Sequence, residues 1–137
     1  MLFRSPAEAI ESLRVRVPEF SPFEIETGEV EIFPVSDVVY LSISRGHNRL
    51  EEMYRALNAG PLKYQEPFPY HPHITLAQNL THELSIELAA LAAKRWSAYP
   101  YPRLFPVESL SFVQSATGNL WVDLAHFQMD PAPSILR

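Results

Sequence analysis

The residues best suited to proton-transfer chemistry lie in one short segment, where two histidines and a threonine alternate with other residues. His71, His73 and Thr75 are each two positions apart, and Ile74 and Leu76 lie between or beside them. Alternate side chains of a β-strand share a face. We therefore expect the histidines and the threonine to line a wet cleft, while Ile74 and Leu76 point the other way, into a core.

An imidazole and a hydroxyl on one face suit phosphate chemistry. The imidazole of His73 can give or take a proton near neutral pH. The hydroxyl of Thr75 can donate a hydrogen bond to an anionic oxygen. Two alternatives remain open. His73 could be a core histidine satisfied by the backbone, or His71 and His73 could share a metal ion, although zinc usually takes three or four protein ligands and the chain contains no cysteine.

Composition limits the partners that this chain could bind. The 137 residues are 47% hydrophobic and 20% charged, as in an ordinary globular domain. The net charge of −5 argues against binding of duplex nucleic acid, which needs many basic side chains to neutralise phosphates. A small phosphate ester or an RNA end remains a candidate ligand. No apolar run approaches the roughly 20 residues of a membrane span, so we expect no membrane association and a cytoplasmic location.

Helix and strand signals alternate along the chain. We expect helices over residues 5–14, 48–59 and 81–96, and strands over residues 23–33, 37–44, 70–78, 105–114 and 119–129. Ser5, Asn48 and Thr81 are the predicted N-caps, and Gly60 is the predicted stop of the second helix. Gly28 indicates a bulge or tight turn in its strand, and residues 115–118 form the predicted hairpin loop.

These elements predict an α+β fold of antiparallel sheets with helices on their outer faces. We expect one domain over residues 1–130, followed by a loose tail over residues 131–137. The apolar stripe of Leu50, Met53, Tyr54 and Leu57 should face a core. In the strand over 37–44, Tyr40 lies on the more polar face, which either borders the cleft or is simply solvated.

The string His73-Ile74-Thr75-Leu76, preceded by Pro72 and a run of prolines and aromatics, resembles a signature of the 2H phosphoesterases. These proteins are also called 2′-5′ RNA ligase-like or cyclic-phosphodiesterase-like. The strand over residues 38–43, the helix that follows it and the last strand around Trp121 are similar to the family's element order. The resemblance covers the chain from about residue 20 to residue 129 and implies two lobes around a central cleft.

The resemblance implies an enzyme that cleaves or forms RNA phosphodiester bonds through 2′,3′-cyclic phosphates or 2′-5′ linkages. One histidine would act as general base and a partner histidine as general acid, while two Thr or Ser hydroxyls hold the phosphate oxygens. No metal or other cofactor is implied. Carried over to this chain, His73 is an acid/base residue and Thr75 holds the phosphate.

The neighbours of the motif are the implied substrate contacts. Tyr70 and His71 precede His73 and could touch a ribose or a base, because an exposed aromatic ring can stack on an unpaired base. Tyr70 could equally be a core aromatic. Tyr40 faces the predicted cleft. Gln78 stands where many relatives have arginine, which weakens the electrostatic hold expected on the phosphate.

The chain departs from the family in having one His-x-Thr/Ser motif rather than two. None of the other histidines has Ser or Thr two residues later; these are His47, His71, His82 and His126. We therefore expect an incomplete first lobe, a longer natural product with a second motif immediately before Met1, and weak catalysis by this chain alone. The alternatives are a non-catalytic nucleotide- or RNA-binding remnant and an interaction domain. A strand edge exposed near the N-terminus could also pair two copies into a homodimer.

Overall fold

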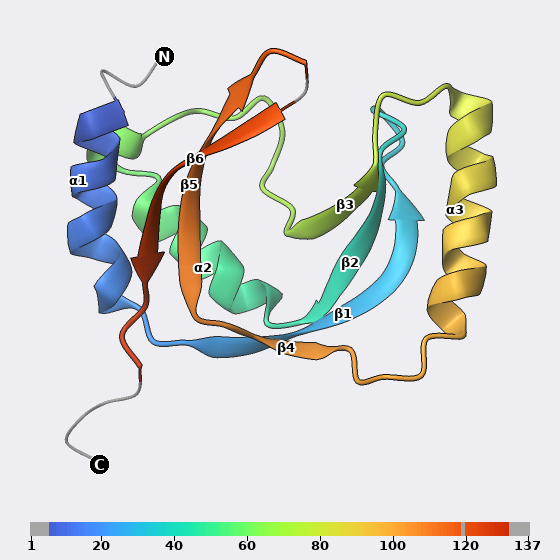
Figure 1. Cartoon of the computed structure of the whole chain (residues 1–137), viewed down its shortest axis with the longest axis horizontal. Helices are drawn as coiled ribbons and strands as arrows, with labels where there is room; N and C mark the ends of the chain where they lie inside the picture. The colour runs from blue at the N-terminus through green and yellow to red at the C-terminus, as the bar shows by residue number, and fades with distance from the viewer. Residues whose placement is uncertain (1–5, 119, 132–137) are drawn as a thin grey trace. The chain divides into compact units, whose positions relative to one another are not determined.

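The computed structural model describes residues 6–118 and 120–131, along which helices and strands alternate (Figure 1). The helices are α1 (Pro6–Arg16), α2 (His47–Leu57) and α3 (His82–Ser97), with short 3₁₀ turns at Val17–Glu19 and Gly60–Leu62. The strands are β1 (Phe23–Ile32), β2 (Val39–Arg45), β3 (His73–Ala77), β4 (Leu104–Val107), β5 (Ser109–Ala116) and β6 (Leu120–Gln128). The predicted α+β class is confirmed.

The chain forms two compact units, each built from separate stretches of sequence. The first unit comprises the described residues of Met1–Phe23, Glu52–Tyr70 and Pro106–Arg137. The second comprises Glu24–Glu51 and His71–Phe105. Two units agree with the two lobes that the family resemblance implies. That residues 1–130 behave as a single domain stays a prediction.

The first unit has its core between helices and a hairpin. The buried side chains come from α1 and the turn after it, from the second half of α2, and from β6 and the residue just beyond it; they are Leu13, Val17, Met53, Phe127 and Met129. Met53 belongs to the apolar stripe that the sequence predicted to face a core. β5 and β6 pair in antiparallel register and supply further apolar side chains, including Leu110 and Phe112.

The second unit is organised around a four-stranded sheet in the order β3-β2-β1-β4. β2 pairs antiparallel with both β1 and β3, so it lies inside the sheet while β3 is an edge strand. The register of β1 shifts between Thr27 and Val30, which confirms the bulge predicted at Gly28. A Cβ at Gly28 would clash with the hydroxyl oxygen of Ser42. That hydroxyl instead accepts a hydrogen bond from the Glu29 amide at 3.0 Å.

Helix α3 is fixed at both ends. The hydroxyl of Thr81 accepts a hydrogen bond from the Leu84 amide at 3.2 Å, which confirms the predicted N-cap. At the other end the indole of Trp96 donates to the carbonyl of Gly28 in β1 at 2.8 Å. The guanidinium of Arg103 lies 4.3 Å from the centre of the Trp96 ring.

None of the helices in the described part of the chain has the length and apolar character that crossing a bilayer requires.

Several predicted boundaries were wrong for local reasons. Helix α2 begins at His47, so Asn48 lies in its first turn and is not the N-cap. Gly46, at φ 91°, turns the chain directly after β2, and its carbonyl accepts from the amides of Arg49 and Leu50 at 3.1 and 3.2 Å. The helix ends at Leu57, and Gly60 opens a 3₁₀ turn instead of stopping α2.

The strand predicted over residues 105–114 is two strands. β4 joins the four-stranded sheet as an edge, where Pro106 is tolerated because an edge strand needs no donor on its outer side. β5 then pairs with β6. The predictions that fall on Ser5, on Asn119, on residues 132–137 and on a dimer edge near Met1 lie outside the described residues.

One contact joins the turn between β1 and β2 to the start of α3. Its contribution to the stability of the fold should depend on pH. Nδ1 of His82 lies 2.9 Å from a carboxylate oxygen of Asp37. This hydrogen bond, followed by the charge of Asp37, raises the pKa of His82 above its ordinary value of 6.5. Because the folded-state pKa is raised, the contact stabilises the fold fully below the unfolded-state pKa. Its contribution is lost as pH rises through the folded-state pKa.

We expect Asp37→Asn to lower the pKa of His82, measured by NMR titration of its imidazole carbon-bound protons. Asp37 has φ 58°, and asparagine tolerates this left-handed conformation, so the turn should survive the change. Glu83→Gln is the control, since Glu83 contributes least to raising this pKa. An unchanged pKa for His82 in the Asp37→Asn protein would show that the contact with Asp37 does not form in solution.

Candidate active site

Strand β3 places the two residues of the motif opposite a polar stretch of β2. His73 pairs with Ser42 and Thr75 pairs with Tyr40. His73 and Thr75 are both exposed, and their spacing of two within the strand puts them on one face. His71 lies just before the strand begins and is also exposed. The predicted juxtaposition of the motif's imidazole and hydroxyl is therefore present in the fold.

Aromatic rings hold the imidazoles. Phe33 stacks on Tyr40 with ring centroids 3.9 Å apart. The ring of His73 meets Phe33 nearly at right angles, at 4.9 Å and 89°. His71 meets the same ring at 5.3 Å and 80°. Both histidines also lie edge-on to Tyr40 at 5.6 Å. Edge-to-face packing of this kind restricts the rotation of each imidazole.

A backbone hydrogen bond determines the tautomer of His73. Its Nδ1 lies 2.6 Å from the carbonyl oxygen of His71. A carbonyl can only accept, so Nδ1 must carry the hydrogen. In the neutral ring Nε2 then keeps its lone pair and can act as a base, and the protonated ring can return that proton as an acid. The core-histidine alternative does not hold, because His73 is bonded to the backbone but is exposed.

Tyr40 is the buried ring against which both imidazoles pack. It is only 4% exposed, and its hydroxyl donates to a carboxylate oxygen of Glu31 at 3.1 Å. Burial, and then the hydrogen bond and charge of Glu31, raise the pKa of Tyr40 above 10.0, so the phenol stays neutral near pH 7. Tyr40 thus packs on both histidines, and a direct contact between Tyr40 and substrate stays a prediction.

Phe33 is the residue of this cluster that sequence reasoning missed. Its amide donates to the carbonyl of Val38 at 2.9 Å across the turn between β1 and β2. The signal was present in the short gap between the strands predicted over residues 23–33 and 37–44, since a short antiparallel connection brings the end of one strand alongside the start of the next. That pairing places Phe33 close to Tyr40.

The two remaining predicted substrate contacts are Tyr70 and Gln78. Tyr70 belongs to the first unit, where its ring stacks parallel to Tyr54 with centroids 4.3 Å apart. Gln78 is exposed and follows the end of β3. Substrate contact by either residue stays a prediction.

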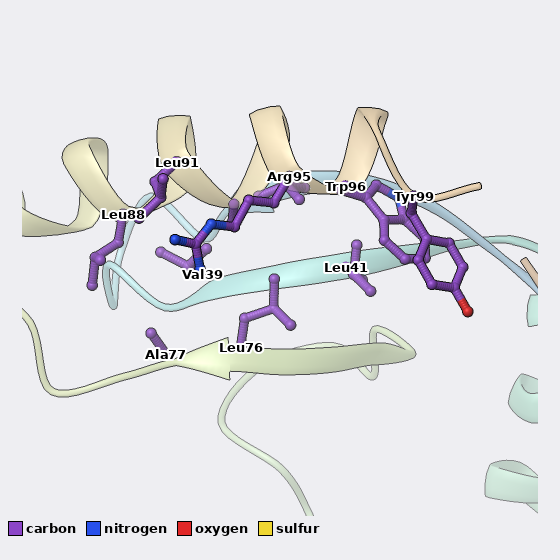
Figure 2. A pocket seen from close by; sticks show the side chains of 11 residues that line it. Val39, Leu41, Leu76, Ala77, Leu88, Leu91, Arg95, Trp96 and Tyr99 are labelled. Atoms are coloured by element: carbon purple, nitrogen blue, oxygen red, sulfur yellow. The ribbon is translucent and has the colours of Figure 1, made fainter. Parts of the chain in front are cut away.

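The far face of β3 differs from the prediction. Ile74 is half-buried, but Leu76 is 46% exposed. Leu76 lines a pocket of about 490 Å³ formed by the sheet and α3 (Figure 2). The expectation of a closed core here was wrong, because α3 does not cover this part of the sheet.

Ligands for a shared metal ion do not gather around His71 and His73. Among the residues that the structure describes, no three His, Cys, Asp or Glu side chains are close enough to hold one metal ion. The metal alternative therefore lacks a third ligand within residues 6–118 and 120–131. That the chemistry needs no cofactor stays a prediction.

Comparison with known proteins identifies relatives of this chain. The family model described as the 2′-5′ RNA ligase superfamily matches residues 1–119. Three similar proteins all bear the name "Putative phosphoesterase". The one from Halalkalibacterium halodurans is 35% identical over 99 residues, which is 68% of this chain. Those from Oceanobacillus iheyensis and Staphylococcus haemolyticus are 32% and 26% identical over 78 and 74 residues, or 56% and 53% of this chain.

The matched stretches make up 57%, 45% and 43% of these three relatives. The chain thus spans about half the length of the curated relatives that it matches.

The tautomer of His73 can be measured directly. In the neutral ring we expect the ¹⁵N signal of Nδ1 to be that of a hydrogen-bearing nitrogen, and the signal of Nε2 to be that of a nitrogen with a free lone pair. His71→Ala should leave this tautomer unchanged, because the acceptor is the backbone carbonyl of residue 71. A neutral ring with its hydrogen mainly on Nε2 would contradict the geometry.

Proposed function

Because the chain belongs to the 2′-5′ RNA ligase superfamily, we propose that it carries one of the two proton-transfer sites of a metal-independent phosphodiesterase. The substrate is a 2′,3′-cyclic phosphate or a 2′-5′ linkage, at an RNA end or in a small phosphate ester. The observation that supports this most is the imidazole of His73, anchored through Nδ1 with Nε2 free to exchange a proton. The net charge of −5 favours a short ligand over duplex nucleic acid.

The proposed reaction transfers one proton in each direction. In hydrolysis of a cyclic phosphate, the oxygen of water attacks phosphorus while a base removes the water's proton. The bond from phosphorus to one ribose oxygen breaks, and an acid protonates that oxygen. Nε2 of His73 takes one of these two roles. Thr75, two residues along the same face, donates a hydrogen bond to a non-bridging oxygen as negative charge builds on it.

The other proton-transfer role needs a second group. The family resemblance implies a second His-x-Thr or His-x-Ser motif, and none of the other four histidines of this chain has that pattern. We propose that a second motif lies elsewhere in the natural protein. The 137-residue chain by itself should bind the phosphate group but turn it over slowly, since losing one acid/base partner costs about 10²–10⁴-fold in rate.

The catalytic assignment is tested in the full natural reading frame that contains this chain, with uridine 2′,3′-cyclic phosphate as substrate. His73→Ala should lower kcat/KM by about 10²–10⁴-fold. Thr75→Val should lower it by about 10²-fold, while Thr75→Ser should keep most of the activity because it retains the donor. His126→Ala is the matched histidine control: its ring bonds to Ser111 and Gln128 in the other unit.

If His73→Ala hydrolyses the cyclic phosphate as fast as the unchanged protein, the catalytic proposal fails. Equal losses in His73→Ala and His126→Ala would point to a general effect on folding. In that case circular dichroism should show the same loss of structure in both proteins.

The alternative function is nucleotide binding without turnover, and the presence of one motif instead of two favours it for the 137-residue chain. We expect calorimetry to detect weak binding of 2′-AMP that Thr75→Val reduces. Binding should be the same with and without a chelator. Binding that disappears with chelator would support the shared-metal reading of His71 and His73 instead.

A further inference from the structure

Glu31 places a carboxylate on the face of the sheet that carries the motif. It pairs with Tyr40 of β2, and Tyr40 pairs in turn with Thr75 of β3. Directly paired residues of adjacent strands point to one face, so these three residues form a row across the neighbouring strands β1, β2 and β3 (Figure 1). Because adjacent strands lie about 4.8 Å apart, the backbones at Glu31 and Thr75 are separated by roughly 10 Å. A ligand whose phosphate lies at Thr75 can therefore extend along the row to Glu31.

The carboxylate of Glu31 is only partly used within the protein. Its Oε1 accepts a hydrogen bond from the hydroxyl of Tyr40 at 3.1 Å. Within residues 6–118 and 120–131, its Oε2 has no hydrogen-bond or ion-pair partner, and the residue is exposed. An ionised carboxylate accepts hydrogen bonds through both oxygens. Glu31 can therefore receive two donors from a ligand while it keeps Tyr40.

A negative charge at this position is unfavourable for phosphate binding by itself. The carboxylate of Glu31 repels an anion bound on the same face of the sheet. Holding Tyr40 does not require the charge, because a neutral amide oxygen would accept the same hydrogen bond. Hydrogen bonds to a charged acceptor are stronger than neutral ones, so donors on the ligand would offset the repulsion. We therefore expect the part of the ligand distant from its phosphate to present hydrogen-bond donors to Glu31.

The hydrogen-bonding edges of the four RNA bases differ in the donors that they offer. Proteins read unpaired RNA bases largely on their Watson–Crick edges. Guanine presents N1–H and its 2-amino group side by side on that edge, and these two donors match the two oxygens of a carboxylate. Adenine and cytosine each place one amino group beside an acceptor nitrogen. Uracil places its single N–H between two carbonyl oxygens. Guanine is thus the base that a carboxylate can bind with two hydrogen bonds.

We propose that Glu31 selects guanine at the candidate active site, accepting hydrogen bonds from N1–H and the 2-amino group while the phosphate lies at His73 and Thr75. This inference rests on the proposed function, and it specifies the substrate as guanosine 2′,3′-cyclic phosphate or an RNA that ends in it. Phe33, two residues after Glu31, is half-buried and stacks on Tyr40. Its ring offers a surface on which the base can stack.

The test compares the 2′,3′-cyclic phosphates of guanosine, inosine and adenosine as substrates of the full natural reading frame. We expect kcat/KM to be about tenfold higher for guanosine than for adenosine. Inosine, which lacks the 2-amino group, should lie between them. Glu31→Gln should remove the preference, because the glutamine amide sets a donor against a guanine donor. The glutamine oxygen still accepts from Tyr40, so activity on the adenosine compound should be retained.

Glu29→Gln is the matched control, since it removes the same charge two residues earlier in β1. The side chain of Glu29 is 80% exposed, and its carboxylate lies 4.0 Å from the guanidinium of Arg103. This change should leave the ratio of kcat/KM for guanosine to that for adenosine as it is in the unchanged protein.

The results that overturn the inference differ from those that overturn the proposed function. If Glu31→Gln keeps the guanosine preference, or lowers activity on all three compounds equally, Glu31 does not read the base. If none of the compounds is hydrolysed, or His73→Ala keeps full activity, the proposed function fails instead.

Calorimetry tests base selection without turnover. The 137-residue chain should bind 2′-GMP about tenfold more tightly than 2′-AMP, and Glu31→Gln should remove this difference. Equal affinities of the unchanged chain for the two nucleotides would overturn the selection of guanine by Glu31.

Discussion

The arrangement of the second unit depends on the register of β2 between β1 and β3. That register places Tyr40 opposite Glu31 on one side and opposite Thr75 on the other. A slip of one residue would turn every side chain of a strand to the opposite face. If β2 slipped, Tyr40 would lose its ring contacts with Phe33 and both histidines. If β3 slipped, the motif would face α3. The bulge at Gly28, accommodated by the absence of a Cβ beside Ser42, is part of what fixes this register.

His73 shows how much a local sequence can determine about its own chemistry. The acceptor for its Nδ1 is the carbonyl two residues earlier, so the tautomer is set within the tripeptide His71-Pro72-His73. The tripeptide does not determine the orientation of the ring. That orientation comes from contacts with Phe33, just after β1, and with Tyr40 in β2. The tautomer of His73 is thus set locally, whereas the orientation of its ring is set by the sheet.

The structural features that depend on periodicity and capping were predicted correctly from the sequence. The α+β class, the bulge at Gly28, the N-cap at Thr81 and the exposed face shared by His73 and Thr75 all follow from spacing or from one side chain. Prediction failed where distant segments decide the outcome. The split between β4 and β5 depends on which sheet each strand joins, and the exposure of Leu76 depends on where α3 is held. Phe33 was missed because its contact with Tyr40 exists only once β1 and β2 pair.

The two faces of the sheet are physically linked, because the same strands carry both. Leu41 and Leu76 line the pocket between the sheet and α3, while Tyr40 and Thr75, their neighbours in sequence, lie on the face of the motif. β3 is an edge strand, so its register is held by β2 on one side only. Apolar packing over Leu41 and Leu76 would add to the hydrogen bonds that hold β3 on β2. The precision with which His73 and Thr75 are presented therefore depends on what covers the opposite face of the same two strands.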